Sequence, residues 1–243
     1  MNHQSTLEQF QQLKLFGMAQ RYEAILNLPV QELPEPHSIV ANLAEAETNY
    51  GGHQRTQLYL RLSKLRYNTV PEHINCSADR GITKAELATL TDGSFIQRAE
   101  NLLITGATGC GKSYLACALG RQACMLGFRT LYYSMNRLIE ALAAARLDGS
   151  YLRWINQIAK MPLLILDDFG LQSLNHDMKL TLLQILEDRF AKGATIITAQ
   201  LPVAKWHEYI NEPTIADAIC DRLTANAHRI ELKGDSLRKR KNN

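Results

Sequence analysis

The sequence has few of the features that mark secreted or membrane proteins. Its five cysteines form no CxxC pair and no Cys/His set at zinc-ligand spacing, so we expect free thiols in a reducing compartment. No stretch approaches the roughly 20 apolar residues that span a bilayer, and the opening MNHQSTLEQFQQLK has no apolar signal core. We therefore expect a cytoplasmic protein with no membrane partner. The cysteines are Cys76, Cys110, Cys117, Cys124 and Cys220.

The chain also has little net charge, at +3, so its overall composition does not demand a nucleic-acid partner. The charge is unevenly distributed, however. Residues 1–50 hold two basic and six acidic side chains, whereas residues 51–70 hold four basic side chains and no acidic one. Such a cluster fits contact with phosphates, although a solvated charged face is the commoner explanation. The candidate DNA-binding residues are Arg55, Arg61, Lys64 and Arg66.

The first 70 residues predict a small helical module for DNA binding or assembly. Apolar residues recur at roughly helical spacing over residues 5–28, with an interruption at Gly17. A second helical stretch covers about residues 37–65 and is interrupted at Gly51–Gly52. Residues 71–93 have weak periodicity and are predicted to form a linker. No internal repeat accompanies these helices.

From residue 94 to residue 243 the pattern changes to short apolar runs that alternate with longer helical stretches. This alternation, with continuous apolar strands, predicts an α/β fold in which helices cover both faces of a parallel five-stranded sheet. The predicted strands are Asn101–Thr105, Thr130–Ser134, Leu163–Leu166, Thr195–Thr198 and His228–Leu232. The predicted helices cover residues 112–126, 136–146, 150–159, 177–191 and 214–224.

The segment GATGCGKS matches the phosphate-loop pattern GxxxxGK[ST] in full, between a predicted strand and a predicted helix. Its glycines let successive N–H groups face phosphate oxygens, and the helix dipole adds to this effect. We expect Lys112 to reach the β- and γ-phosphates of ATP and Ser113 to ligate Mg²⁺. The alternative is a glycine-rich turn with a chance lysine. The predicted ATP-binding residues are Gly106, Ala107, Thr108, Gly109, Cys110, Gly111, Lys112 and Ser113.

A second motif, LLILDD, places two carboxylates after a buried strand. Such a strand ends at the edge of the sheet beside the phosphate loop, where Asp167 is predicted to hold the magnesium ion through water. Asp168 is then placed to polarise the attacking water. The alternative is that Asp168 only forms a turn or caps a helix.

Three further groups are candidates for contact with the nucleotide. If the predicted strand Thr195–Thr198 lies between the two motif strands, Thr198 or Gln200 lies near the γ-phosphate, although both are also ordinary strand-end groups. Arg222 ends a predicted helix and is a candidate arginine finger for a neighbouring subunit, or else a surface partner of Asp217 or Asp221. Arg238 either contacts the nucleotide or begins a basic tail.

The ordered set of motifs resembles the IstB-type transposition helper ATPases, which are kin of the helicase loader DnaC. The resemblance rests on residues 106–113, 163–170 and 195–207, on Asp221-Arg222-Leu223, and on the segment Gly234-Asp-Ser-Leu-Arg238. The opening LKLFGMA also resembles their N-terminal helix, so the similarity covers roughly residues 5–240.

This resemblance implies an AAA+ core, ATP-dependent oligomers on double-stranded DNA, and stimulation of a transposase from the same mobile element. It assigns Thr198 or Gln200 to the first sensor, Arg222 to the finger and Arg238 to a second arginine contact. The chain departs from many AAA+ proteins in having Asp168 in place of glutamate and Gln200 in place of asparagine. The short segment after Arg238 leaves little or no room for a C-terminal helical lid.

Two other functions share parts of this pattern. A helicase loader has the same core and uses its N-terminal module to grip a helicase, so co-purification with a helicase or a transposase separates these hypotheses. A small-molecule kinase also carries a phosphate loop, but it usually adds an arginine-rich mobile lid over the acceptor. The region between the motifs shows no clustered acceptor-binding set.

Overall fold

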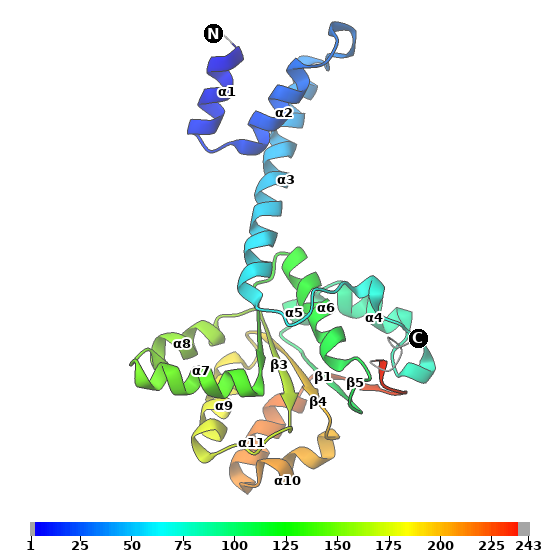
Figure 1. The fold of residues 1–243 in the computed structure, drawn as a ribbon, viewed down its shortest axis with the longest axis vertical. Coiled ribbons are helices and arrows are strands. Elements are labelled where there is room, and N and C mark those ends of the chain that lie inside the picture. The colour runs from blue at the N-terminus through cyan, green and yellow to red at the C-terminus, as the bar shows by residue number, and fades with distance from the viewer. Residues whose placement is uncertain (1–2, 238–243) are drawn as a thin grey trace. The chain divides into compact units, whose positions relative to one another are not determined.

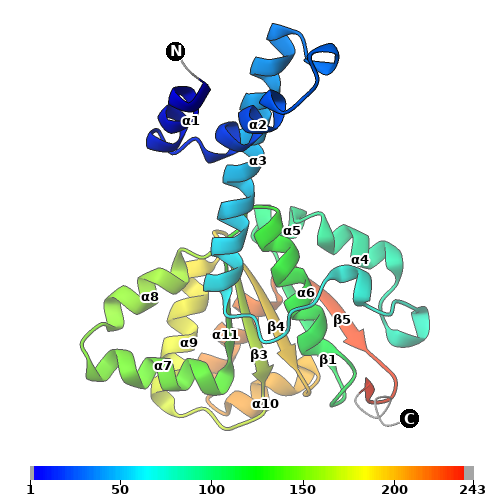
Figure 2. The ribbon, with the colours of Figure 1, turned by 45° about the horizontal axis from the view of Figure 1, so that its top comes forward.

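The computed structural model describes residues 3–237 and divides the chain into two compact units, Met1–Leu58 and Tyr59–Asn243. Figures 1 and 2 show the helical first unit in blue and the α/β second unit in the remaining colours. The two units divide after Leu58, whereas the sequence suggests that the helical module ends at residue 70. Arg238 lies outside the described residues.

Helices alone build the first unit. They are α1 (His3–Gln12), α2 (Phe16–Leu26), the short 3-10 helix η1 (Val30–Glu32) and most of α3 (Pro36–Ser63). The chain turns between α1 and α2 at Lys14, whose φ is 60°. The predicted interruption at Gly17 is therefore wrong. Gly17 is buried inside α2, and a Cβ there would lie 2.4 Å from the carbonyl oxygen of Ala46 in α3, so the glycine permits close helix packing.

Helix α3 is continuous through Gly51 and Gly52, so the interruption predicted there is also wrong. A Cβ at either position would meet nothing within 4 Å. These glycines therefore serve no close contact within the described chain. Each costs helix stability on the order of 1 kcal/mol relative to alanine, which a helix of 28 residues tolerates.

The second unit contains one parallel five-stranded sheet, as the sequence predicts. Its strands are β1 (Asn101–Gly106), β2 (Thr130–Ser134), β3 (Leu163–Phe169), β4 (Ala194–Ala199) and β5 (Ala227–Leu232). Their order is β2-β3-β4-β1-β5. Strand β4 thus lies between the phosphate-loop strand β1 and the acidic-motif strand β3, which is the condition under which Thr198 or Gln200 approaches the nucleotide.

Alternate residues of the strands point to opposite faces, and two apolar cores result. One face packs Leu103, Leu164 and Ile197 against the larger group of helices. The other packs Leu102 and Ile165 against the smaller group, which Figure 1 shows with α6 crossing the sheet. The first group is α7 (Met135–Leu147), α8 (Tyr151–Ala159), α9 (His176–Arg189), α10 (Trp206–Ile210) and α11 (Pro213–Thr224). The second is α4 (Lys84–Thr91), α5 (Ser94–Gln97) and α6 (Lys112–Met125).

The segment predicted to be a linker, residues 71–93, packs into the second unit. Ile82, Leu87 and Leu90 belong to its buried core, and a capping box from Thr83 and Glu86 starts α4. The weak periodicity reflects two short 3-10 helices, η2 (Pro71–His73) and η3 (Ala78–Arg80). In the described part of the chain, no helix is both long and apolar enough to cross a membrane.

Candidate nucleotide-binding site

The phosphate loop joins the end of β1 to the start of α6, as its sequence context requires. Gly109 has a φ of 84° and Gly111 a φ of 104°, so both adopt the left-handed region that favours glycine. The buried Lys112 amine donates to the carbonyl oxygens of Gly106 at 2.8 Å and Ala107 at 3.0 Å. The loop therefore curls around the amine.

Segments remote in sequence support the loop from outside. The Arg80 guanidinium donates to the carbonyl oxygen of Cys110 at 2.7 Å, and the Leu237 N–H donates to the carbonyl oxygen of Gly109 at 3.0 Å. A Cβ at Gly109 would lie 2.2 Å from the Ser236 Oγ, so only glycine fits beneath this C-terminal segment. Sequence patterns gave no signal for these contacts.

Asp167 is fully buried at the end of β3 and accepts three hydroxyl hydrogen bonds. The Ser113 Oγ donates to its Oδ1 at 2.7 Å, and the Tyr132 hydroxyl donates to its Oδ2 at 2.6 Å. The Thr198 hydroxyl also donates to Oδ1. Burial and the neighbouring Asp167 raise the pKa of Tyr132, so the phenol stays protonated and keeps donating. The phosphate loop and the acidic motif therefore meet directly, as the sequence predicts.

Asp168 adopts a left-handed conformation, with a φ of 63°, at an irregularity in the pairing of β3 with β4. Its backbone N–H donates to the Thr198 hydroxyl at 3.1 Å. The Asp168 side chain is 29% exposed, whereas that of Asp167 is fully buried. Burial, followed by the charge of Asp167, raises the pKa of Asp168, and Arg66 opposes the shift.

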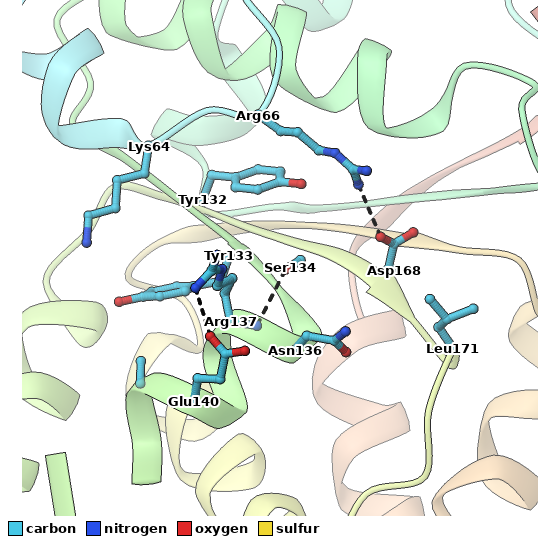
Figure 3. Close-up of a pocket in the computed structure, with 11 residues that line it drawn as sticks. Lys64, Arg66, Tyr132, Tyr133, Ser134, Asn136, Arg137, Glu140, Asp168 and Leu171 are labelled. Carbon is cyan, nitrogen blue, oxygen red and sulfur yellow. Dashed lines mark hydrogen bonds and ion pairs between the residues drawn. The ribbon is translucent and has the colours of Figure 1, made fainter. Parts of the chain in front are cut away.

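Arg66 has a contact that its predicted DNA-binding role does not include. Its Nη1 lies 3.4 Å from Asp168 Oδ2 and 3.7 Å from Asp167 Oδ2, while its side chain remains 45% exposed. Figure 3 shows this side chain pointing toward Asp168. Arg66 is thus placed beside the acidic pair, more than a hundred residues away along the chain.

A cavity of about 530 Å³ opens beside the phosphate loop and the acidic pair. Its lining includes seven predicted residues, which are Thr108, Gly109, Gly111, Lys112, Ser113, Asp168 and Gln200. A second cavity, of about 270 Å³, shares part of its lining with the first. Residues of the segment 71–93, among them the apolar Ile74 and Ile82, also line it. The shared residues are His73, Gly111, Tyr114 and Leu237. The sequence did not point to His73, Tyr114 or Leu237.

The remaining candidates lie in different places. Thr198 is buried between the two aspartates, whereas Gln200 is exposed at the cavity. Arg222 donates to Asp221 at 2.7 Å and lies 4.7 Å from the centre of the Phe190 ring. Its backbone oxygen accepts from Asn101, at the start of β1, so Arg222 lies at the end of the sheet opposite the phosphate loop.

Comparisons with known proteins identify the family. A family model described as IstB-like ATP binding protein matches residues 8–243. The chain belongs to the IstB-like ATP-binding proteins. An insertion sequence ATP-binding protein of Sinorhizobium fredii is 43% identical over 234 residues, which cover 96% of each chain. The insertion sequence IS21 ATP-binding protein of Pseudomonas aeruginosa is 28% identical, over 93% of this chain and 85% of the relative.

Solved structures confirm the AAA+ fold of this IstB-like chain. DnaI superimposes with a TM-score of 0.58 and 20% identity, over 70% of this chain and 90% of DnaI. The DnaC helicase loader gives a TM-score of 0.56 and 18% identity, over 70% of this chain and 99% of the loader. AMPPCP-bound DnaA from Aquifex aeolicus gives a TM-score of 0.59 and 18% identity, over 71% of this chain and 52% of DnaA. At these identities, the likeness supports the fold alone.

Proposed function

We propose that the protein is an ATP-hydrolysing regulator that assembles on double-stranded DNA and stimulates the transposase of its own insertion sequence. One observation carries the ATPase part of this proposal. The Ser113 hydroxyl and the Asp167 carboxylate meet at 2.7 Å, next to the loop that encloses Lys112. The phosphate loop, Lys112 and Ser113 line one cavity, and the buried Asp167 lies directly behind the Ser113 hydroxyl.

The donor set fits a magnesium ion. Mg²⁺ prefers oxygen ligands and is usually held by one or two protein groups together with waters and substrate phosphates. Ser113 would ligate it directly, and the buried Asp167 would hold one of its waters. When bound, it neutralises charge on the phosphate oxygens. Tyr132 and Thr198 fix the orientation of Asp167 for this purpose.

The other residues have separate roles in hydrolysis. Lys112 exchanges its two backbone acceptors for the phosphates of ATP, because a triphosphate is a stronger acceptor for an ammonium group. Asp168 accepts a proton from the attacking water, and Gln200 orients that water or the γ-phosphate from the cavity wall. His73, Tyr114 and Leu237 are placed to contact the base or sugar.

A neighbouring subunit supplies Arg222 to complete the site. Strand β1 has six residues, so its two ends lie roughly 16 Å apart. Arg222 is tied to the first end and the phosphate loop follows the second, which is too far for an arginine in the same chain. An arginine finger acting in trans makes hydrolysis depend on assembly.

The DNA and transposase parts rest on charge and on relatives. Arg55, Arg61, Lys64 and Arg66 are exposed and contribute to an acid-free stretch that suits the DNA backbone. Exposed apolar side chains of the first unit, such as Val30 and Val40, suit self-assembly. Relatives at 43% and 38% identity are named as ATP-binding proteins of insertion sequences. A helicase-loader function has support only from the fold.

Binding to a DNA duplex in the presence of different nucleotides tests the proposed switch. We expect tight binding and large assemblies with a slowly hydrolysed ATP analogue, and weak binding with ADP, because only the triphosphate engages Arg222 of a neighbour. Fluorescence anisotropy of a labelled duplex and analytical ultracentrifugation measure these two properties. Equal affinity and equal assembly size with both nucleotides would contradict the proposal.

Lys112→Ala is expected to weaken ATP binding by roughly 10- to 150-fold, because it removes hydrogen bonds from a cation to charged phosphates that are worth about 1.5–3 kcal/mol. Isothermal titration calorimetry measures this affinity. Lys192→Ala removes an exposed lysine near the start of β4, far from the loop, and is the matched control. Full ATP affinity in Lys112→Ala would exclude the phosphate loop as the binding site.

A further inference from the structure

A third cavity borders Asp168. It has a volume of about 820 Å³ and lies between the chain that follows α3, the strand β2 and the start of α7 (Figure 3). Within residues 3–237, only Asp168 lines both this cavity and the 530 Å³ cavity beside the phosphate loop. We call it the Arg66 cleft, after the arginine that reaches across it to Asp168.

The polar lining of the Arg66 cleft favours an anion. Three cationic side chains, Lys64, Arg66 and Arg137, line it and outnumber its two carboxylates, Asp168 and Glu140. Arg137 pairs with Glu140 at 2.9 Å, but both side chains are largely exposed, so this ion pair is weak. Among residues 3–237, no carboxylate lies within ion-pair distance of Lys64. Tyr133 and Asn136 add neutral hydrogen-bonding groups.

These features match a phosphodiester of a DNA backbone. Arginine and lysine side chains that converge on one open cleft are the groups that contact DNA phosphates. Lys64 and Arg66 also belong to the acid-free stretch of residues 51–70. The cleft is large enough for a phosphate together with its sugar.

Arg66 is shared between this cleft and the catalytic acid. Its distances of 3.4 Å to Asp168 and 3.7 Å to the buried Asp167 are both long for charge-assisted hydrogen bonds, and nearly half of its side chain is exposed. Long contacts from a half-exposed side chain are weak, so a phosphate in the cleft can compete for the guanidinium. While Arg66 is paired with Asp168, its guanidinium contacts a carboxylate oxygen that must accept a proton from water.

We propose that the Arg66 cleft binds a backbone phosphate of duplex DNA, and that this phosphate draws Arg66 away from Asp168 and releases the acid for hydrolysis. This inference rests on the proposed function and adds a route by which DNA controls the ATPase site. Arg66 is a positioning residue in this scheme, since it acts through Asp168.

Steady-state hydrolysis with and without a DNA duplex tests this coupling in the full chain. We expect duplex to stimulate the wild-type protein roughly two- to fivefold, the range set by an exposed ion pair. Arg66→Gln should raise the rate without DNA by a similar factor and abolish further stimulation. Arg229→Gln loses the same charge on β5, at the opposite edge of the sheet from β2, and should behave as wild type.

Duplex affinity gives a readout that does not depend on hydrolysis. Measured with a non-hydrolysable analogue, the slope of log affinity against log salt should fall by about one for Arg66→Gln, as for one lost phosphate contact. Arg137 does not touch Asp168. Arg137→Gln should also reduce the slope of log affinity against log salt, and it should reduce the stimulation of hydrolysis by duplex.

The outcomes separate this inference from the proposed function. A wild-type protein that neither hydrolyses ATP nor binds duplex overturns both. The proposed role of the cleft alone is overturned if the wild-type protein hydrolyses ATP and binds duplex normally while Arg66→Gln matches it in basal rate, stimulation and salt slope. A lower basal rate in Arg66→Gln also overturns it, because Arg66 would then assist the reaction rather than restrain Asp168.

Discussion

Arg222→Ala is expected to reduce ATP hydrolysis by roughly 10³-fold or more while leaving the ATP affinity of the same chain unchanged. The reason is the position of Arg222 at the end of β1 opposite the phosphate loop, where it can neutralise transition-state charge only for another subunit. In the free chain the guanidinium is held by Asp221 and by the Phe190 ring. Both contacts are at the surface, so their loss should cost little stability.

Mixing two inactive chains distinguishes action in trans from a local defect. Arg222→Ala keeps an intact phosphate loop, and Lys112→Ala keeps an intact Arg222. An assembly of both chains contains interfaces at which the first provides the loop and the second provides the arginine. Hydrolysis should therefore reappear on mixing, and its dependence on the mixing ratio is measured by phosphate release.

Arg153→Ala, an exposed arginine on α8, is the control for loss of one surface charge. It should hydrolyse ATP at the wild-type rate. If Arg222→Ala matches wild type at concentrations where assemblies form, Arg222 is not a finger. If its activity is lost and mixing does not restore any, Arg222 acts on its own subunit or on assembly itself.

The parts of this fold that the sequence predicts are those specified by local patterns. The three central strands β1, β3 and β4 come from short apolar runs, because a strand buried on both faces must be largely apolar. The edge strand β5 differs, since its sequence AHRIEL alternates exposed charged residues with buried apolar ones at its end. The phosphate loop is likewise a contiguous motif whose glycines and lysine act on one turn of backbone. The sequence placed Thr198 near the nucleotide only on the condition that its strand lies between the two motif strands, because strand order is not a local property. The position of β4 between β3 and β1 fulfils that condition.

The contacts around the acidic pair lie outside the reach of such patterns. Tyr132 and Asp167 are 35 residues apart, and Arg66 and Asp168 are 102 apart. Tyr132 resembles any aromatic residue in an apolar strand, and Arg66 resembles any basic surface residue. The phosphate-contact interpretation of residues 51–70 therefore grouped Arg66 with its sequence neighbours and missed its partner across the fold.

Glycine misled the helix predictions for a related reason. Gly17 and the pair Gly51–Gly52 have the same low helix propensity, yet all three lie inside helices. Gly17 does so because the backbone of α3 comes so close that a side chain has no room. The actual turn, at Lys14, uses a residue that seldom adopts a positive φ, and nothing in the composition singles it out.

Asp168→Asn is expected to lower hydrolysis by roughly 10²- to 10⁴-fold, the usual contribution of a general base, while ATP binding persists. Asparagine has nearly the same shape but cannot accept the proton of water. Burial and Asp167 raise the pKa of Asp168, so wild-type hydrolysis should decline on acidification sooner than an ordinary aspartate would allow. The variant should remain bound to duplex DNA with ATP, because the step that loosens the assembly is blocked. Stopped-flow phosphate release and duplex anisotropy measure both effects.

The left-handed turn at Asp168 favours the shape-matched substitution, since asparagine adopts a positive φ more readily than alanine. Asp79→Asn, at an exposed position in η3, controls for the loss of one carboxylate and should leave the rate unchanged. Wild-type turnover in Asp168→Asn would transfer the water-activating role to another group at the cavity, for which Gln200→Ala is the next test. Loss of ATP binding together with hydrolysis would instead make Asp168 part of the metal site, because a general base contributes to the chemical step and not to affinity for the nucleotide.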